Sequence, residues 1–180
     1  MTPSKRTRLF LILLVLMAIT RAGHFGSVVS LPDASLAIFL LGGFWLGAAG
    51  YFAAFAALGF GIDVSLAKTA VEAGWCLTPA YGGLVAGYGV MWLAGRWLAR
   101  TPELPPLRFV AVSLGALFGA FLIANISFWG LSGYFDAMAL SDYASRVARY
   151  FPAYLASTSL YLGTGWIAQR LMQARKPALA

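Results

Sequence analysis

The chain contains few charged residues. They make up 11% of its 180 residues, and only six residues are acidic, whereas soluble domains carry about 25% charged residues. Hydrophobic residues account for 61%, and the mean hydropathy is +0.78. This scarcity excludes an ordinary soluble domain, because a folded surface in water needs more polar cover. It predicts an integral membrane protein in contact with a lipid bilayer.

Cysteine and histidine are almost absent as well. Cys76 and His24 are the only residues of their kinds, so an internal disulfide is excluded. The sequence has neither the CxxC nor the HExxH pattern of zinc sites, and no CxxCH haem-attachment motif. Its glycine pairs lie within apolar segments, and no GxSxG nucleophile motif occurs. These absences exclude nucleotide-driven transport by this chain alone and argue against a Ser-His-Asp hydrolase.

Basic residues outnumber acidic ones, and the formal net charge is +7. They flank apolar segments and form no basic stripe, so nucleic acid is not an expected partner. The first apolar stretch, from Leu9 to Thr20, could imitate a secretory signal. Arg21 and His24 follow it in place of a convincing small-residue cleavage site. We therefore expect this stretch to be retained as the first helix.

Further apolar stretches recur along the chain, and each is a helix candidate because backbone amides in hydrocarbon must pair within their own segment. The stretch from Leu36 to Phe60 fits either one long tilted span or two short helices broken near Gly47. Splitting it places nine of the thirteen basic residues on the side of the N-terminus. The positive-inside rule favours that arrangement, with the N-terminus in the cytoplasm.

The sequence therefore predicts one all-α transmembrane domain over residues 1–180. It would have six transmembrane helices, with short second and third helices and both termini in the cytoplasm. Small residues at Gly83-x-x-x-Gly87 and Gly115-x-x-x-Gly119 predict close helix packing within the chain. The predicted helices cover approximately residues 8–23, 34–47, 50–61, 79–98, 108–130 and 146–172.

Four polar residues fall on the outer side of this arrangement, from three separate connections. They are His24 after the first helix, Asp63 after the third, and Cys76 and Tyr81 around the start of the fourth. Each has a simpler interpretation: an inert small side chain for Cys76, and interfacial or helix-end groups for the others. Their convergence on one face is what a ligand pocket requires. A cysteine thiolate favours soft metal centres.

The segment Leu31-Pro-Asp-Ala-Ser-Leu-Ala-Ile-Phe-Leu-Leu-Gly-Gly-Phe44, with His24 before it and Gly-Trp-Cys76-Leu-Thr-Pro after it, resembles the BtuM proteins. These are small bacterial inner-membrane proteins related to the substrate-binding S-components of energy-coupling-factor (ECF) vitamin transporters. The resemblance covers essentially the whole chain. It implies an S-component-like fold that binds cobalamin (vitamin B12) at the periplasmic face and carries it across the inner membrane.

The resemblance also implies roles for the polar residues. Cys76 would supply a thiolate as an axial ligand to the cobalt of cobalamin, while His24, Asp63 and Tyr81 match the family's polar residues on the cobalt side of the corrin. Electron donation by the thiolate would weaken the bond to the opposite ligand, so we expect bound cyanocobalamin to lose its cyanide. All four residues are candidates for assisting that decyanation.

Other function classes stay open. One is a membrane-embedded thiol enzyme that acts through Cys76 on a lipid, quinone or haem-type substrate. Another is an accessory subunit of a larger complex, with the polar face as its docking surface. ECF S-components dock a shared membrane subunit through small residues on the first helix. Here Ala18-x-x-x-Ala22 lies toward the outer end of a Leu-rich helix, which favours a solitary carrier without an obligatory ATPase module.

Overall fold

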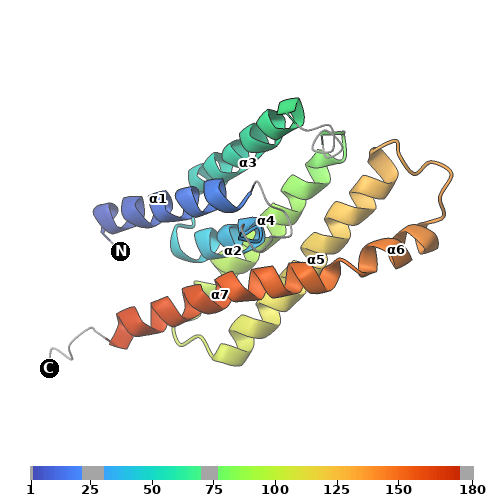
Figure 1. Ribbon diagram of the computed structural model, residues 1–180. Coiled ribbons are helices and arrows are strands. Elements are labelled where there is room, and N and C mark those ends of the chain that lie inside the picture. The colour runs from blue at the N-terminus through green and yellow to red at the C-terminus, as the bar shows by residue number, and fades with distance from the viewer. Residues whose placement is uncertain (1, 22–30, 70–76, 175–180) are drawn as a thin grey trace, which may run out of the picture.

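The computed structural model describes residues 2–21, 31–69 and 77–174. Within these ranges every regular element is a helix, which confirms the all-α prediction. In Figure 1 the start of α1, the turn between α4 and α5, and the end of α7 lie toward the same end of the molecule. The helices are α1 (Pro3–Thr20), α2 (Ser35–Trp45), α3 (Ala49–Thr69), α4 (Tyr81–Leu98), α5 (Pro106–Leu131), α6 (Leu140–Ala148) and α7 (Phe151–Ala174).

The apolar stretch around Gly47 forms two helices, so the predicted split is confirmed. At the end of α2, the Leu46 and Gly47 amides both donate to the Gly42 carbonyl, at 2.8 and 3.1 Å. Gly47 has a φ of +71°, a left-handed conformation that costs glycine no steric penalty. The chain then reverses and begins α3 at Ala49.

The third helix is longer than predicted. We expected it to be short and to end near residue 61, but α3 has 21 residues and ends at Thr69. The prediction treated Asp63 as a helix-end residue. In the structure Asp63 is buried and paired (below), and the Ser65 hydroxyl donates to the Gly61 carbonyl within the helix at 2.8 Å. Polar residues in this part of the chain therefore do not end the helix.

The last predicted helix is two helices. The amphipathic α6 ends at Ala148, and α7 begins at Phe151, with Pro152 as its second residue. Proline has no backbone N–H and its ring clashes with the preceding turn, so α6 cannot continue through Pro152. Proline is well tolerated in the first turn of a helix, so it instead starts α7.

By length and composition, two of the described helices can cross a membrane: α3 over Ala49–Lys68 and α5. The prediction of six such spans is not supported by this criterion. α2 has only 11 residues, and α1 carries three basic residues, Lys5, Arg6 and Arg8, in its first two turns. Glycines and tyrosines dilute the apolar residues of α4.

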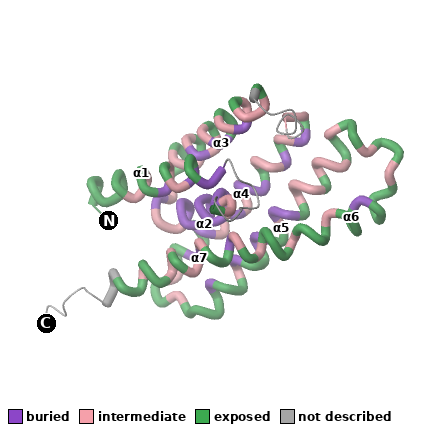
Figure 2. The backbone as a smooth tube through the Cα atoms, in the orientation of Figure 1, coloured by how far each residue is buried: buried purple, intermediate pink, exposed green. Residues whose placement is uncertain are grey.

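Helix α2 lies at the centre of the fold and contacts α1, α3, α4 and α7. Figure 2 shows the buried class concentrated there, and eight of its 11 residues are buried. α2 packs against α4 with almost no space between the backbones. A Cβ on Gly43 would meet the Trp92 carbonyl, and one on Gly95 would meet the Leu40 carbonyl. Glycine at these positions therefore sets the distance between the two helices.

The predicted close packing through Gly83 and Gly87 is confirmed. A Cβ on Gly83 would meet the Ser127 side chain, and one on Gly87 would meet the backbone at Ala120, so both glycines face α5. Gly115 has open space around it instead. The small residues of α4 therefore make the interface, and one of the matching small residues of α5 does not.

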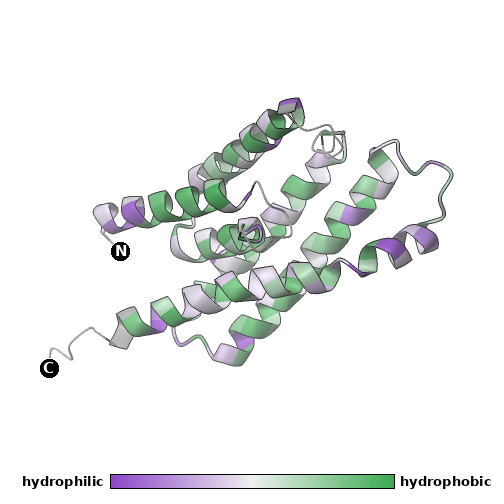
Figure 3. Cartoon of the chain, viewed as in Figure 1, coloured by the Kyte–Doolittle hydropathy of each residue, from purple (hydrophilic) through white to green (hydrophobic). Residues whose placement is uncertain are grey.

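Charge is distributed unevenly between the two ends of the molecule. Figure 3 shows hydrophilic residues at the start of α1 and along α6, with mainly apolar helices between them. At the end that carries the start of α1 and the α4–α5 turn, the described charged residues are mostly basic. They are Lys5, Arg6, Arg8, Arg96, Arg100, Glu103, Arg108 and Arg170.

Candidate ligand-binding site

A buried arginine forms the centre of a polar cluster at the other end of the fold. Arg21 directly follows α1, and its side chain is only 2% exposed. Its guanidinium pairs bidentately with Asp63 of α3: Nε donates to Oδ1 at 3.0 Å, and Nη2 donates to Oδ2 at 2.6 Å. The Asp63 side chain is 6% exposed. Such a planar two-bond geometry makes this the strongest kind of side-chain ion pair.

The start of α2 supplies the second part of the cluster. Asp33 Oδ1 accepts hydrogen bonds from the Ser35 amide at 2.9 Å and the Ser35 hydroxyl at 2.6 Å. The Ser35 hydroxyl in turn accepts from Arg21 Nη1 at 2.9 Å. Arg21 Nη1 also lies 3.6 Å from Asp33 Oδ2. The cluster therefore fixes the start of α2 against the end of α1, and the Ala34 amide, which donates to Thr20 at 3.2 Å, adds to this.

Two tyrosines of α4 complete the cluster. Tyr81, the first residue of the helix, donates its hydroxyl proton to Asp63 Oδ2 at 3.0 Å. Tyr88 lies two turns further along, is 3% exposed, and accepts a hydrogen bond from Arg21 Nη1. Its ring stacks on Phe39 of α2, with 4.3 Å between the ring centroids. Side chains from four segments thus meet at one guanidinium.

A cavity of about 270 Å³ opens beside this cluster. Arg21, Asp33, Asp63 and Tyr88 form its polar wall. The lining residues that come from α5 and α7 are mainly apolar. The remaining lining residues are Leu36, Leu84, Gly87, Ala120, Phe121, Ala124, Asn125 and Tyr154.

The amphipathic helix α6 is tied to this cavity through Asn125. Tyr143 of α6 donates to Asn125 Oδ1 at 3.3 Å, and Asn125 Nδ2 donates to the Phe121 carbonyl at 2.8 Å. Burial raises the pKa of the Tyr143 hydroxyl to about 12. A tyrosine with its ordinary pKa of about 10 already keeps its proton at physiological pH, so the raised pKa extends the donor role of Tyr143 to more alkaline solution.

Two of the four predicted site residues meet in the structure. Asp63 and Tyr81 are directly hydrogen-bonded, as convergence on one face requires. His24 and Cys76 lie outside the described residues, so their predicted roles stay predictions. Asp63 was one of the candidates for assisting decyanation. Its two oxygens take three hydrogen bonds from Arg21 and Tyr81, which makes Asp63 a counter-ion that positions its neighbours.

The sequence prediction missed the residue at the centre of the cluster. Arg21 was taken only as a flanking charge, and Asp33, Ser35 and Tyr88 were not singled out. One signal was available, because an ionisable residue at the end of an apolar helix calls for a partner of opposite charge. Within the described ranges, no three side chains of His, Cys, Asp or Glu gather as metal ligands. The cobalt ligation predicted for Cys76 is not tested by that observation.

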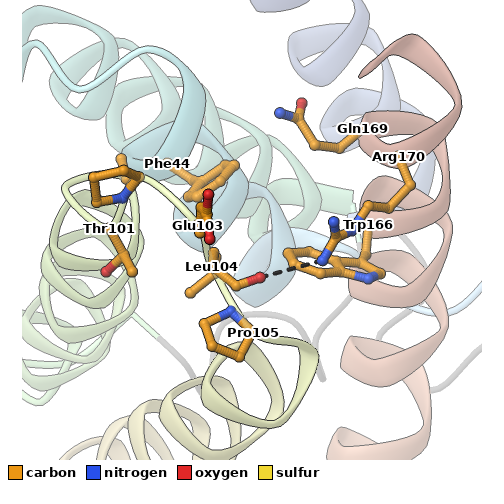
Figure 4. A pocket seen from close by; sticks show the side chains of 10 residues that line it. Phe44, Thr101, Glu103, Leu104, Pro105, Trp166, Gln169 and Arg170 are labelled. Carbon is orange, nitrogen blue, oxygen red and sulfur yellow. Dashed lines mark hydrogen bonds between the residues drawn. The ribbon is translucent and has the colours of Figure 1, made fainter. Parts of the chain in front are cut away.

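A larger cavity of about 650 Å³ lies at the opposite end, between α2, α7 and the α4–α5 turn. Figure 4 shows Arg170 and Trp166 on one side of it and Glu103 on the other. Arg170 Nη2 donates to the Leu104 carbonyl at 3.2 Å, and Gln169 accepts from Trp45 at 3.0 Å. None of its ten lining residues is buried, so it offers no desolvated polar anchor comparable to Arg21 and Asp63.

Removing the Tyr81 hydroxyl tests whether it stabilises the cluster. We expect Tyr81→Phe to lower the free energy of unfolding by about 1 kcal/mol, the usual net value of one such hydrogen bond. Asp63 would keep both bonds from Arg21, so the loss should stay well below that of removing Asp63 itself. Thermal unfolding of the purified protein in detergent measures the change. A variant as stable as the wild type would show that the bond contributes nothing to folding.

No protein-family model matches this chain, and no curated protein matches it.

Proposed function

We propose that the protein is a multi-pass protein of the bacterial inner membrane that binds cobalamin and carries it inward. A wide apolar surface supports the membrane assignment. Large apolar side chains lie exposed along α1, α5 and α7, and contiguous exposed apolar patches mark membrane or protein interaction sites. They include Leu11, Ile12, Val15, Ile19, Val110, Leu114, Phe118, Leu122, Ile126, Leu160, Ile167 and Leu171.

The charge distribution supports the proposed orientation. Basic residues gather at the end that carries the start of α1, the α4–α5 turn and the end of α7. The positive-inside rule assigns such an end to the cytoplasm. The Arg21–Asp63 cluster and its cavity would then face the periplasm. In the six-pass arrangement that we propose, α6 would lie at the periplasmic interface. The shorter helices would cross the membrane packed against neighbouring helices.

The observation that carries the ligand proposal is the buried Arg21–Asp63 pair, with the half-buried Tyr81 bonded to it, beside a cavity. Ionisable groups inside apolar helices are costly, and they usually mark a substrate path or binding site. Two of the residues that the family resemblance points to, Asp63 and Tyr81, lie in it. The other two are close in sequence: His24 is three residues after Arg21, and Cys76 is five residues before Tyr81.

The size of the cavity limits how much of the ligand it can enclose. Pockets for drug-sized ligands measure about 300–1,000 Å³, and cobalamin is larger than a typical drug. A cavity of about 270 Å³ can therefore hold one edge of the corrin ring and its side chains. The remainder of the ligand would lie above that cavity, on the periplasmic side.

Decyanation is a ligand exchange that needs no oxidant or reductant. The Cys76 thiol would give up its proton, and the thiolate would replace the weaker axial ligand on one face of the corrin. That ligand leaves with the electron pair of its own bond as the thiolate donates a pair to Co(III). Cyanide leaves the other face with the electron pair of its bond and is protonated to hydrogen cyanide. The cobalt keeps its oxidation state throughout, and a soft thiolate is a suitable donor for such a centre.

The test is a visible absorption spectrum of the protein purified in detergent with cyanocobalamin, recorded beside Cys76→Ala. We expect a bound corrin band that is shifted from free cobalamin in the wild type and unshifted or absent in the variant. Cyanide release at equal rates from both proteins would refute the role of Cys76 in decyanation. A colourless wild-type protein under saturating cobalamin would overturn the B12 assignment and favour the thiol-enzyme or accessory-subunit alternatives.

A further inference from the structure

The cavity beside Arg21 carries more negative than positive charge. Among its described lining residues only Arg21, Asp33 and Asp63 are charged, and one cation with two carboxylates gives a formal net charge of −1. A net charge facing an apolar cavity is poorly solvated, so it favours a ligand group that donates hydrogen bonds to it.

The two carboxylates share Arg21 unequally. Asp63 takes two short hydrogen bonds, at 3.0 and 2.6 Å, and a third from Tyr81. Asp33 Oδ2 lies 3.6 Å from Arg21 Nη1, too far for a hydrogen bond. Within the described part of the chain, Asp33 Oδ2 accepts no hydrogen bond. The Asp33 side chain is also the more accessible of the two, 20% exposed against 6% for Asp63. The excess negative charge therefore resides on Asp33, at the cavity wall.

The surroundings of Asp33 define what would bind there. Leu36, Leu84 and Phe121 give the cavity apolar walls, suited to a hydrophobic ring edge. Beside them, the Asp33 carboxylate can accept a strong hydrogen bond from an N–H donor on the ligand. A carboxylate on the ligand would instead meet like-charge repulsion in a region of low dielectric. Primary amides combine an N–H donor with no net charge. A ring that carries amide side chains matches both features of the cavity.

We propose that Asp33 is a specificity-determining residue of this cavity, which accepts a hydrogen bond from a primary amide on the edge of the corrin and rejects ligands that carry carboxylates there. This inference rests on the proposed function, because it assumes that the cavity holds a corrinoid. It adds a substrate class: fully amidated corrinoids, in preference to precursors whose side chains are still carboxylic acids.

The experiment measures the affinity of the purified protein for cobinamide, which has amide side chains, and for cobyrinic acid, which has carboxylates. We expect the wild type to bind cobinamide at least tenfold more tightly. Asp33→Asn keeps the shape and the acceptor for Ser35 but removes the charge, so it should reduce that preference about tenfold. Asp33→Glu keeps the charge and should keep the preference. Asp136→Asn is the matched control, since Asp136 is exposed and does not line the cavity.

The outcomes separate the two proposals. A wild type that binds both corrinoids equally, or an Asp33→Asn variant with an unchanged preference, overturns the assignment to Asp33 and leaves cobalamin binding intact. A wild type that binds no corrinoid overturns both. Equal binding by the wild type overturns the assignment even where Asp33→Asn fails to fold, because the preference for amides is a property of the unmodified protein.

Discussion

Replacing Asp63 with alanine is expected to lower the free energy of unfolding by about 3–5 kcal/mol, since it leaves a buried charge without its main partner. Arg21 would retain its hydrogen bonds to Ser35 and Tyr88 and its 3.6 Å contact with Asp33. None of these interactions replaces a bidentate carboxylate. For a chain of this length, that loss corresponds to a fall of about 10 °C in the unfolding temperature. Thermal unfolding in detergent measures it.

Two further variants distinguish the effect of leaving the buried Arg21 charge without its partner from a general effect of losing an acidic residue. Asp136→Ala removes an exposed carboxylate, and we expect a change within about 0.5 kcal/mol. Adding Arg21→Met to Asp63→Ala removes the stranded cation, so roughly half of the lost stability should return. An Asp63→Ala variant no less stable than Asp136→Ala would show that the cluster does not stabilise the fold.

The second large effect is expected at Gly95. Its added Cβ in Gly95→Ala would meet the Leu40 carbonyl, and backbone atoms cannot turn aside as side chains do. α2 and α4 would have to separate along their shared interface. We expect a loss near the upper end of the ~1–3 kcal/mol typical of overpacking. The same thermal unfolding measurement applies.

The matched control lies in the same helix. Gly89 has no neighbouring atom in reach of an added Cβ, so Gly89→Ala should be neutral or should stabilise α4 by up to ~1 kcal/mol, the difference in helix propensity. Equal changes in stability from the two substitutions would mean that α2 and α4 pack less closely than in the structure.

The sequence predicted those parts of the fold that depend on local chemistry. The break at Gly47 follows from a glycine that can adopt a positive φ, and the close approach at Gly83 and Gly87 follows from small residues at helical spacing. The full length of α3 could not be predicted from local chemistry. Asp63 ends a helix if it faces water and lies within one if it faces a cation. Only the fold brings Arg21, 42 residues away along the chain, into contact with it.

The site was predicted in part for the same reason. Asp63 and Tyr81 stand out as polar residues beside apolar segments, and they do meet. Asp33 and Ser35 look like an ordinary helix start, and Tyr88 looks like any aromatic residue inside an apolar helix. Their membership in the cluster depends on where Arg21 points, which hydropathy and spacing do not encode.

The burial of α2 also constrains how the chain can be assembled during synthesis. At about 1.5 Å per residue, its 11 residues extend over about half of a ~30 Å hydrocarbon core. Its closest neighbour, α4, leaves the ribosome only after α3. In the bilayer that we propose, a nascent α2 therefore has only α1, one of its four neighbours, to pack against. It would enter the lipid paired with α3 as a hairpin, or stay beside the translocation machinery until α4 arrives.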